Sequence, residues 1–432
     1  MKTIIPPQQA VLQALGPVRG GGGWRLCQYC LRREVPQGML LYHLLTRELL
    51  LLSPAEWDAA LTLPELQARW FIVPEDTPEQ EHADLVRWAL RAMHKPGPVT
   101  DFTILPTTDC NARCFYCYEA GRPRRMMSQE TAAQAATHII TQSSGKPVRL
   151  RWFGGEPLMN HAAIDAICAT LASQGVPFTS SMTTNGLLFT PETIRTAVDC
   201  WKLRAVQITL DGTEQTYNRT KAYVGADGSP FCTVLANIRS LLEAGVHVAI
   251  RLNVGAHNAP DMLQLAELLA RELRGAGSLN VYARALFSTD SWHCAADPGA
   301  PLAQLTGRLC ELGLQPPARL QRELPLNQCM ADSGRARVIL PDGRLTLCEH
   351  HTEDEIIGHI ASPELDRPLM KAWAQQEAPI PACATCPLYP ECNRLSKCDT
   401  LERCTDESRR AALRSRERSM LAEYQRYLNS QG

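Results

Sequence analysis

The sequence predicts an α/β protein with a parallel sheet, and three observations support this fold class. Strand-like and helix-like runs alternate through the middle of the chain, giving six strands and five clear helices. Two of the strand-like runs end in turn pairs, Asn185-Gly186 and Asp211-Gly212. At 432 residues the chain is also long enough for two or three domains and a sizeable core.

The six predicted strands are short apolar runs, beginning with FTILP at Phe102. The others are residues 148–153, 178–186, 205–212, 246–254 and 279–287. Ser128 precedes the first helix as a cap, with Glu130 close behind it. The predicted helices are Ser128–Gln142, Ala162–Gln174, Glu192–Lys202, Thr233–Ala244 and Asp261–Leu273.

Further segments flank this alternating region. GMLLYHLLTRELLLLS has the character of a strand hairpin, and three helical runs follow it, so residues 36–96 predict a compact α+β domain. The stretch after Cys404 is rich in arginine and predicts a solvated helix. We therefore expect three domains: residues 1–98, 99–320 and 321–432.

Composition excludes several partners. A net charge of −1 with 21% charged residues argues against nucleic acid or a membrane surface as the main partner. No apolar run approaches the length of a membrane span, and the N-terminus lacks the features of a secretory signal. Seventeen cysteines without an export signal indicate metal ligation rather than disulfides. We expect a cytoplasmic protein that prefers low oxygen.

The most informative motif is the C-x3-C-x2-C run formed by Cys110, Cys114 and Cys117. Three thiolates at this spacing suit three corners of a [4Fe–4S] cube and leave the fourth iron open, whereas structural clusters normally have four cysteine ligands. An open metal position can bind a substrate or cofactor. The alternatives are a zinc knuckle or three unrelated core cysteines.

A second motif follows the next strand: Gly154, Gly155, Glu156 and Pro157. Two glycines allow backbone carbonyls to approach a ligand closely, and Glu156 can fix the loop or an ammonium group. With the cysteine run, this GGEP sequence resembles the radical S-adenosylmethionine (radical SAM) superfamily. The resemblance implies an open, partial (β/α)6 barrel in which SAM chelates the open iron.

Polar residues stand where such a barrel would use them. The resemblance implies contacts with SAM from the strand-end residues and from Tyr116, which lies between the second and third cysteines. Arg251 and Asn253 alternate on one strand and therefore share a face, which we expect to be the lumen. The alternative is a structural polar network. The predicted strand-end residues are Asn185, Thr209, Asp211, Arg251 and Asn253.

Seven cysteines between Cys329 and Cys404 form a second constellation. This region resembles the SPASM extension of radical SAM enzymes, which binds one or two auxiliary [4Fe–4S] clusters. The resemblance rests on Gly343-x4-Cys348, the following C-x2-C-x5-C core and a Gly-His-Ile segment. Zinc is the alternative. The resemblance implies one cluster on Cys383, Cys386, Cys392 and Cys404. It implies another on Cys329, Cys348 and Cys398, whose fourth position is Cys310, His350, His351 or open.

The segment before the barrel resembles the winged-helix-like domain with which peptide maturases of this superfamily bind a leader peptide, although a helical cap is nearly as well supported. The resemblance implies a maturase that abstracts hydrogen from a ribosomal precursor peptide and forms a thioether, carbon–carbon or ether cross-link. A flavodoxin or ferredoxin would supply electrons. Cys27 and Cys30 form a further C-x2-C, for which we expect no catalytic role.

Two alternative functions stay open. Anaerobic sulfatase maturases, which make formylglycine, place an acidic base directly after the Gly-x4-Cys cysteine, and here that position is Glu349. A non-catalytic iron–sulfur electron carrier would explain the cysteines but not the GGEP loop. Cleavage of SAM to 5′-deoxyadenosine would separate a carrier from an enzyme.

Overall fold

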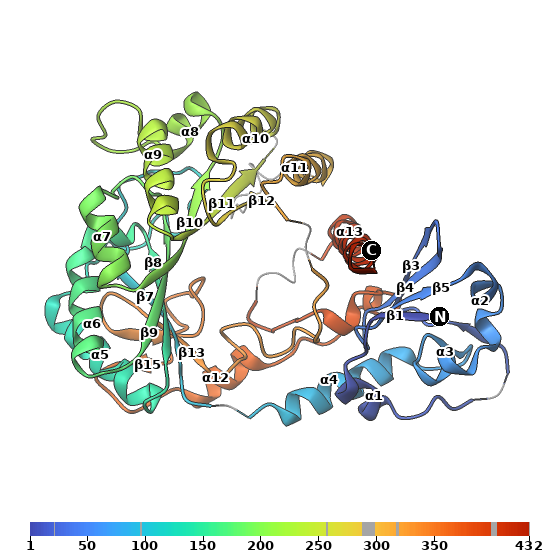
Figure 1. Ribbon diagram of the computed structural model, residues 1–432. Helices are drawn as coiled ribbons and strands as arrows, with labels where there is room; N and C mark the ends of the chain where they lie inside the picture. Colours follow the sequence, from blue (N-terminus) through green and yellow to red (C-terminus); the bar gives the residue numbers. More distant parts are fainter. Residues whose placement is uncertain are drawn as a thin grey trace. The chain divides into compact units, whose positions relative to one another are not determined.

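The computed structural model describes residues 1–20, 22–95, 97–255, 258–286, 299–316, 319–398 and 404–431 (Figure 1). The chain divides into two compact units. The first unit comprises Met1–Pro96, Pro317–Asp332 and Ala372–Gly432, and the second comprises Gly97–Pro316 and Ser333–Lys371. The predicted domain 321–432 is thus divided between the units, and the three-domain division stays a prediction.

The second unit is built on a nine-stranded sheet in which six strands follow one another in sequence order. All neighbouring pairs among these six are parallel, as the alternation of strands and helices predicts. The strands are β7 (Asp101–Thr107), β8 (Val148–Gly154), β9 (Phe178–Thr184), β10 (Leu203–Leu210), β11 (His247–Val254) and β12 (Leu279–Ala285). The sheet is open, because β7 pairs on its other side with β13 (Ala336–Ile339) and not with β12.

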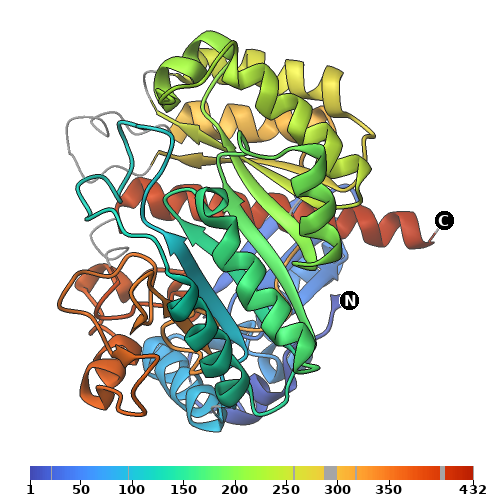
Figure 2. The same cartoon turned by 90° about the vertical axis from the view of Figure 1, so that its left-hand side faces the viewer.

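The five predicted helices are present, with small differences at their ends. Ser128 caps the first of them, since its hydroxyl accepts the backbone N–H of Thr131 at 3.0 Å. The helices are α5 (Gln129–Ser143), α6 (His161–Ser173), α7 (Pro191–Asp199), α9 (Pro230–Glu243) and α10 (Ala259–Leu273). Figure 2 shows this helical layer in front of the strands.

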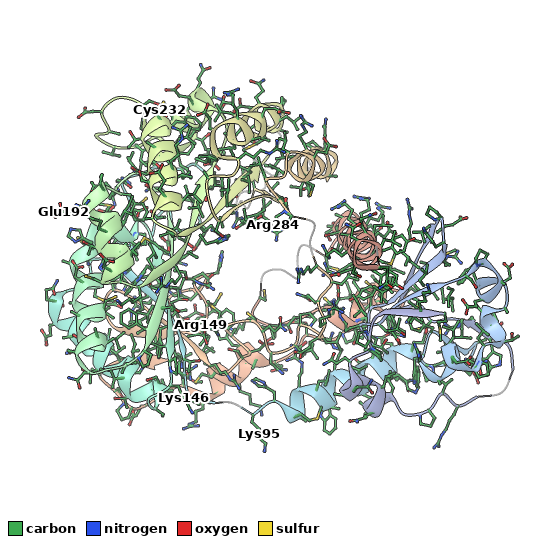
Figure 3. All side chains as sticks on the ribbon, viewed as in Figure 1. Lys95, Lys146, Arg149, Glu192, Cys232 and Arg284 are labelled. Carbon is green, nitrogen blue, oxygen red and sulfur yellow. The ribbon has the colours of Figure 1, made fainter. Side chains whose placement is uncertain are left out.

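Side chains alternate between the two faces of this sheet. On β11 the buried Val248, Ile250 and Leu252 alternate with Arg251 and Asn253, so the last two share the opposite face. Arg284 of β12, labelled in Figure 3, likewise lies on the side of the strands away from α7 and α9. The sheet therefore presents a row of polar side chains on its inner face.

The first unit has an antiparallel sheet of four strands in the order β1-β5-β4-β3 and a separate pair of strands, β2 and β6. The predicted hairpin is β4 (Gly38–His43) with β5 (Leu49–Leu52). The other strands are β1 (Lys2–Ile5), β2 (Trp24–Leu26), β3 (Cys30–Val35) and β6 (Ile72–Pro74). The helices are α1 (Gln9–Leu15), α2 (Pro54–Asp58), α3 (Pro64–Ala68), α4 (Glu79–Met93) and α13 (Asp406–Gln431).

The expectation of a solvated C-terminal helix is only partly right. Met420 and Tyr424 of α13 are buried and belong to the same core cluster as Leu40 and Leu44 of the N-terminal region. These two residues are four apart and therefore share one face of the helix. That apolar face packs onto the N-terminal core, while most of the arginines occupy the rest of the helix surface.

Short elements complete the described chain. They are η1 (Ala60–Thr62), η2 (Pro157–Asn160), α8 (Glu214–Lys221), α11 (Gly299–Glu311), β14 (Arg344–Thr346), β15 (Gly358–His359), α12 (Arg367–Ala374), η3 (Pro381–Cys383) and η4 (Tyr389–Glu391). Within the residues that the structure describes, no helix combines the length and apolar character that a membrane crossing requires.

Candidate functional site

The cysteine loop follows β7 at the carboxyl end of the sheet. The pKa of the Cys110 thiol is raised to about 11, mainly by burial, and the neighbouring Cys114 and Cys117 thiols contribute to this rise. The backbone turns tightly here, because Cys117 N–H donates to the Cys114 carbonyl at 3.1 Å. The structure therefore gathers the three thiols into one region, as the spacing of the motif predicts.

The two glycines of the GGEP sequence pack directly against the cysteine loop. A Cβ added to Gly154 would lie 2.3 Å from the Thr107 carbonyl oxygen, and one added to Gly155 would lie 2.1 Å from the Asp109 carbonyl oxygen. No side chain fits at those distances. Gly154 also has a φ of 112°, which residues other than glycine rarely adopt. Glycine is therefore required at both positions for the two loops to meet.

Glu156 is completely buried and holds this junction together. Its carboxylate accepts hydrogen bonds from Thr184 Oγ1 at 2.8 Å and from the backbone N–H groups of Asn185 at 2.8 Å and Leu158 at 3.2 Å. Burial raises the pKa of Glu156, while these hydrogen bonds favour its charged form. Glu156 thus connects β8 to the end of β9, and Pro157 begins the turn η2 that follows.

Asn185 links the end of β9 to the cysteine loop. Its Nδ2 lies 2.7 Å from Asn111 Oδ1 and 3.9 Å from the Cys110 sulfur. A side-chain amide beside a thiolate is one of the means by which proteins adjust an iron–sulfur cluster, because hydrogen bonds to sulfur stabilise the reduced form. The structure therefore brings this predicted strand-end residue next to the first cysteine.

Three of the remaining strand-end residues form one hydrogen-bonded network with Tyr116, and the fourth lies beside it. The Tyr116 hydroxyl donates to Asp211 Oδ2 at 2.7 Å, and Asn253 Nδ2 donates to Asp211 Oδ1 at 3.3 Å. Arg251 Nε donates to Asn253 Oδ1 at 2.8 Å, and Thr209 lies beside Arg251 in the register of β10 and β11. These polar groups line the inner face of the sheet near its carboxyl end.

Sequence reasoning missed two members of this network. Lys221, at the end of α8, forms an ion pair with Asp211 at 3.0 Å and donates to the Tyr116 hydroxyl at 3.1 Å. Asn258 donates to the backbone carbonyls of Asp211 at 3.0 Å and Asn253 at 2.9 Å. The segment containing Lys221 gave no signal, because its sequence TEQTYNRTK lacks the apolar periodicity of a packed helix.

Glu349 belongs to the second unit and lies near the end of the cysteine loop. Its charge raises the pKa values of Tyr118 and Glu119, although burial is the larger cause for both residues. Tyr118 also stacks on His350 with ring centroids 4.3 Å apart. The structure therefore places the carboxylate after the Gly-x4-Cys cysteine close to the loop that contains Cys117.

Four of the C-terminal cysteines come together in the first unit. Burial raises the pKa of the Cys392 thiol, which Cys404 and Cys383 raise further, and Cys386 is affected in the same way by Cys383 and Cys404. Two arginines face this group: Arg394 Nη1 lies 3.2 Å from the Cys383 sulfur and Arg409 Nη1 lies 3.4 Å from the Cys404 sulfur. This is the set of four that the resemblance implies for one auxiliary cluster.

The other predicted ligand set stays a prediction. Cys348 belongs to the second unit, together with Cys310, His350 and His351. Cys329 and Cys398 belong to the first unit. Cys348 lies at the end of a tight turn, where its sulfur accepts the backbone N–H of His350 at 3.4 Å.

Cys27 and Cys30 lie beside His43, and their three ligand atoms are all within 4.8 Å of one another. The imidazole is already engaged, because Nε2 lies 3.0 Å from the Trp70 carbonyl and Nδ1 accepts the backbone N–H groups of Leu45 and Thr46 at 3.2 and 3.3 Å. Nδ1 therefore stabilises the turn after β4 and Nε2 contacts the segment before β6, which favours a pair of thiols here over a metal ion held by His43.

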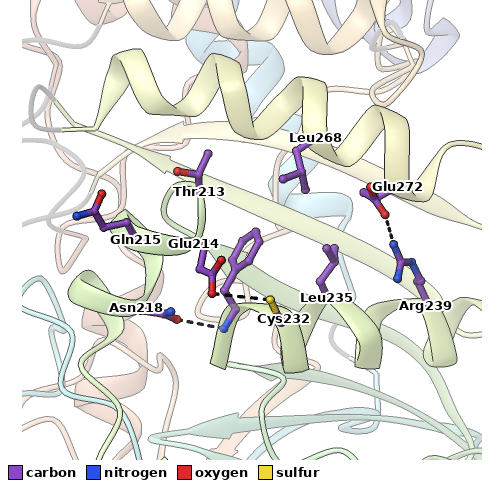
Figure 4. A pocket seen from close by; sticks show the side chains of 10 residues that line it. Thr213, Glu214, Gln215, Asn218, Cys232, Leu235, Arg239, Leu268 and Glu272 are labelled. Atoms are coloured by element: carbon purple, nitrogen blue, oxygen red, sulfur yellow. Dashed lines mark hydrogen bonds and ion pairs between the residues drawn. The ribbon is translucent and has the colours of Figure 1, made fainter. Parts of the chain in front are cut away.

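A hollow of about 870 Å³ lies between α8, α9 and α10 (Figure 4). Glu214, Cys232, Arg239 and Glu272 line it, and Arg239 forms an ion pair with Glu272. The hollow contains none of the residues predicted to bind the cluster or SAM. It is a groove in the outer helical layer.

The donor atoms of the cysteine loop fit a three-thiolate cluster. Three thiols contributed by one loop suit a [4Fe–4S] group with one open iron. The glycine junction leaves no room for side chains between the two loops, so backbone atoms form it. The four thiols in the first unit fit a fully ligated cluster in the same way.

Comparison with known proteins supports this assignment. Residues 104–269 match the model of the Radical SAM superfamily. A probable GTP 3′,8-cyclase of Archaeoglobus fulgidus is 35% identical over 91 residues, which cover 21% of this chain and 29% of the relative's length.

Two solved structures share the fold. One is anSMEcpe with bound S-adenosylmethionine, at 14% identity and a TM-score of 0.57, covering 77% of this chain and 98% of that chain. The other is SuiB of Streptococcus suis bound to S-adenosylmethionine, at 13% identity and a TM-score of 0.50, covering 86% of this chain and 94% of that chain. The chain therefore contains a radical SAM domain and shares its fold with these two structures.

Proposed function

We propose that this protein is a radical SAM maturase that acts on a ribosomally synthesised precursor peptide and forms a cross-link oxidatively. The observation that carries the proposal is the junction of the two loops. The three gathered thiols of Cys110, Cys114 and Cys117 meet a GGEP loop fixed by the buried Glu156. When bound, the cluster and SAM would supply a 5′-deoxyadenosyl radical that takes a hydrogen atom from carbon, and an auxiliary cluster would accept the electron that the substrate then loses.

The chain's own residues have separable parts in this proposal. Cys110, Cys114 and Cys117 would hold the cluster, and the strand-end network of Asp211 and Asn253 would orient SAM. The four thiols of the first unit, Cys383, Cys386, Cys392 and Cys404, would hold the auxiliary group. The network and Glu156 are already hydrogen-bonded, so they would bind SAM without large rearrangement.

A peptide substrate is supported by the structures that share the fold. SuiB was solved bound to precursor peptide SuiA, and covers 86% of this chain at 13% identity with a TM-score of 0.52. anSMEcpe was solved with a Cp18Cys peptide, at 14% identity with a TM-score of 0.54. We propose that the N-terminal segment binds the leader of such a peptide by adding a strand to a sheet edge. We also propose a flavodoxin or ferredoxin as electron donor, and a cytoplasmic location.

A formylglycine-forming activity is the second candidate, and the position of Glu349 favours it. A base must take a proton from the substrate Cys or Ser in that reaction, and Glu349 lies near the cysteine loop beside Tyr118 and Glu119. In the cross-linking proposal Glu349 would be a supporting carboxylate. Replacing Glu349 with Gln should abolish a formylglycine product but leave SAM cleavage intact.

The first test is cleavage of SAM by the anaerobic, reduced protein. We expect 5′-deoxyadenosine from the wild type and none from Cys114→Ala. Cys232→Ala is a matched control, because Cys232 is exposed and lies in the outer groove. Retained cleavage in Cys114→Ala would remove the cluster assignment.

The second test identifies the product. The short peptide encoded beside the gene is co-expressed anaerobically with the enzyme and analysed by mass spectrometry after thiol alkylation. Loss of two hydrogens with fewer alkylated cysteines indicates a thioether, and the same loss with every thiol reactive indicates a carbon–carbon or ether link. An unchanged peptide would contradict the cross-linking proposal and favour the formylglycine candidate.

A further inference from the structure

Lys221 is a buried lysine beside the cysteine loop. Its side chain is 5% exposed, and its ammonium lies 3.0 Å from Asp211 Oδ2 and 3.1 Å from the Tyr116 hydroxyl. The ammonium also lies over the rings of Tyr116 and Tyr217, at 5.7 and 5.8 Å from their centroids. Burying an ammonium costs free energy unless it is paired and hydrogen-bonded. A lysine buried at this position therefore indicates a function for its charge.

The backbone around Lys221 is fastened to the same loop. Arg113 N–H donates to the Lys221 carbonyl at 2.8 Å, and Val224 N–H donates to the Asn111 carbonyl at 2.9 Å. Arg113 and Asn111 both lie between the first two cysteines of the motif. The end of α8 and the cysteine loop therefore form one hydrogen-bonded structure, which fixes the ammonium relative to the thiols.

Lys221 is held close to the second cysteine of the motif. Its backbone carbonyl accepts the N–H of Arg113, the residue directly before Cys114. Its ammonium donates to the hydroxyl of Tyr116, two residues after Cys114. The positive charge is therefore fixed beside the cysteine loop.

Building on the proposed function, we propose that Lys221 sets the reduction potential of the cluster held by Cys110, Cys114 and Cys117. Reduction adds a negative charge to the cluster, and net charge nearby is one of the main determinants of iron–sulfur potentials. A fixed positive charge in a dry site stabilises the reduced form more than it does in water. Lys221 therefore makes the cluster easier to reduce. It is a positioning and tuning residue, not a ligand.

The experiment compares Lys221→Met, which removes the charge at similar size, with Lys221→Arg, which keeps it. Lys146→Met, labelled at its surface turn in Figure 3, is the matched control because Lys146 is exposed in the same unit. Each protein is reconstituted anaerobically without peptide. Its midpoint potential is titrated by EPR, using the signal that changes when SAM is added. That signal separates this cluster from the auxiliary ones.

We expect a more negative midpoint potential in Lys221→Met, and wild-type values in Lys221→Arg and Lys146→Met. An unchanged potential in Lys221→Met with full iron content would overturn the proposal. If Lys221→Met loses the cluster, the iron content of Lys221→Arg is compared with it. Iron retained in Lys221→Arg supports a role for the positive charge. Iron lost from both variants shows that Lys221 has a merely structural role and overturns the proposal.

These outcomes are distinguishable from failure of the proposed function, because the potential is measured without peptide or turnover. An unmodified peptide together with a shifted potential would leave the role of Lys221 intact. Absence of any SAM-sensitive signal in the wild type would overturn both proposals.

Discussion

Gly155→Ala is the substitution for which the structure gives the clearest cost. The new Cβ would lie 2.1 Å from the Asp109 carbonyl oxygen and 2.8 Å from that of Thr108, both backbone atoms that cannot rotate away. An ordinary contact begins at about 3.4 Å, so the two loops would have to separate by about 1.3 Å. Gly155 does not have a positive φ, so alanine adds no backbone strain there and the expected cost is purely steric.

The magnitude follows from two contributions. Overpacking of a tight contact costs about 1–3 kcal/mol. Separation of the loops would also break the hydrogen bond from Glu156 N–H to the Asp109 carbonyl, now 2.9 Å, which is worth about 0.5–1.5 kcal/mol. We therefore expect Gly155→Ala to lower the free energy of unfolding by about 1.5–4.5 kcal/mol.

The assay is urea unfolding of the iron-free protein, followed by tryptophan fluorescence, because Trp152 is fully buried in the adjacent strand. Gly307→Ala is the control, since Gly307 lies in α11 and nothing lies within 4 Å of its added Cβ. That variant should gain about 0.5–1 kcal/mol from lower backbone entropy in the unfolded chain. Gly155→Ala with wild-type stability and full iron after reconstitution would refute the reasoning.

Three further predictions concern buried charges. Glu156→Gln replaces one acceptor oxygen with a donor and should lower the free energy of unfolding by about 1.5–3 kcal/mol in urea titrations; an unchanged value would show that Glu156 does not hold the junction. Burial raises the pKa of Glu48 from 4.5 to about 7, while Arg69 opposes the shift. The protonated form therefore stabilises the fold below pH 4.5, and this contribution of about 3 kcal/mol is lost as the pH rises through 7. Glu48→Gln should consequently gain stability relative to wild type between pH 5 and pH 8, and a difference independent of pH would contradict this. Arg47→Met removes the fully buried partner of Glu391, now 2.7 Å away, and should cost about 3–5 kcal/mol in thermal or urea unfolding; a loss below 1 kcal/mol would argue against a structural role for the pair.

Local sequence patterns predicted the elements of the sheet well. The six strands alternate with helices whose apolar faces are continuous. The spacing of apolar residues and the turn residues are therefore enough to identify the strands and the helices. The exception is α8, in which the buried residues are Tyr217, Thr220 and Lys221. Two of these three are polar, so the helix has no apolar stripe and the sequence resembles a loop.

The cluster motif and GGEP could be recognised because each requires particular residue types at fixed spacing. Lys221 could not, because a lysine is almost always exposed and its burial depends on an ion pair with Asp211 and on Tyr116, which is 105 residues away in sequence. The burial of one face of α13 was also missed. Met420 and Tyr424 are two apolar residues in an arginine-rich helix, and only the tertiary structure reveals the core that covers them.

The composition of the first unit has a consequence for synthesis of the chain. Arg47 and Glu391 are 344 residues apart, and the core around Leu40 and Leu44 includes Met420 and Tyr424 of the last helix. At ribosomal rates of about 5–20 residues per second, the N-terminal hairpin would wait roughly 20–70 s before the residues that complete its core are made.

During that interval the apolar surface of β4 and β5 lacks its final cover, while the second unit can already form around consecutive parallel strands. A nascent chain of this kind is a natural client for chaperones that shield exposed apolar surface. Truncation before α13 should therefore yield a protein whose N-terminal region aggregates even though its sheet can assemble.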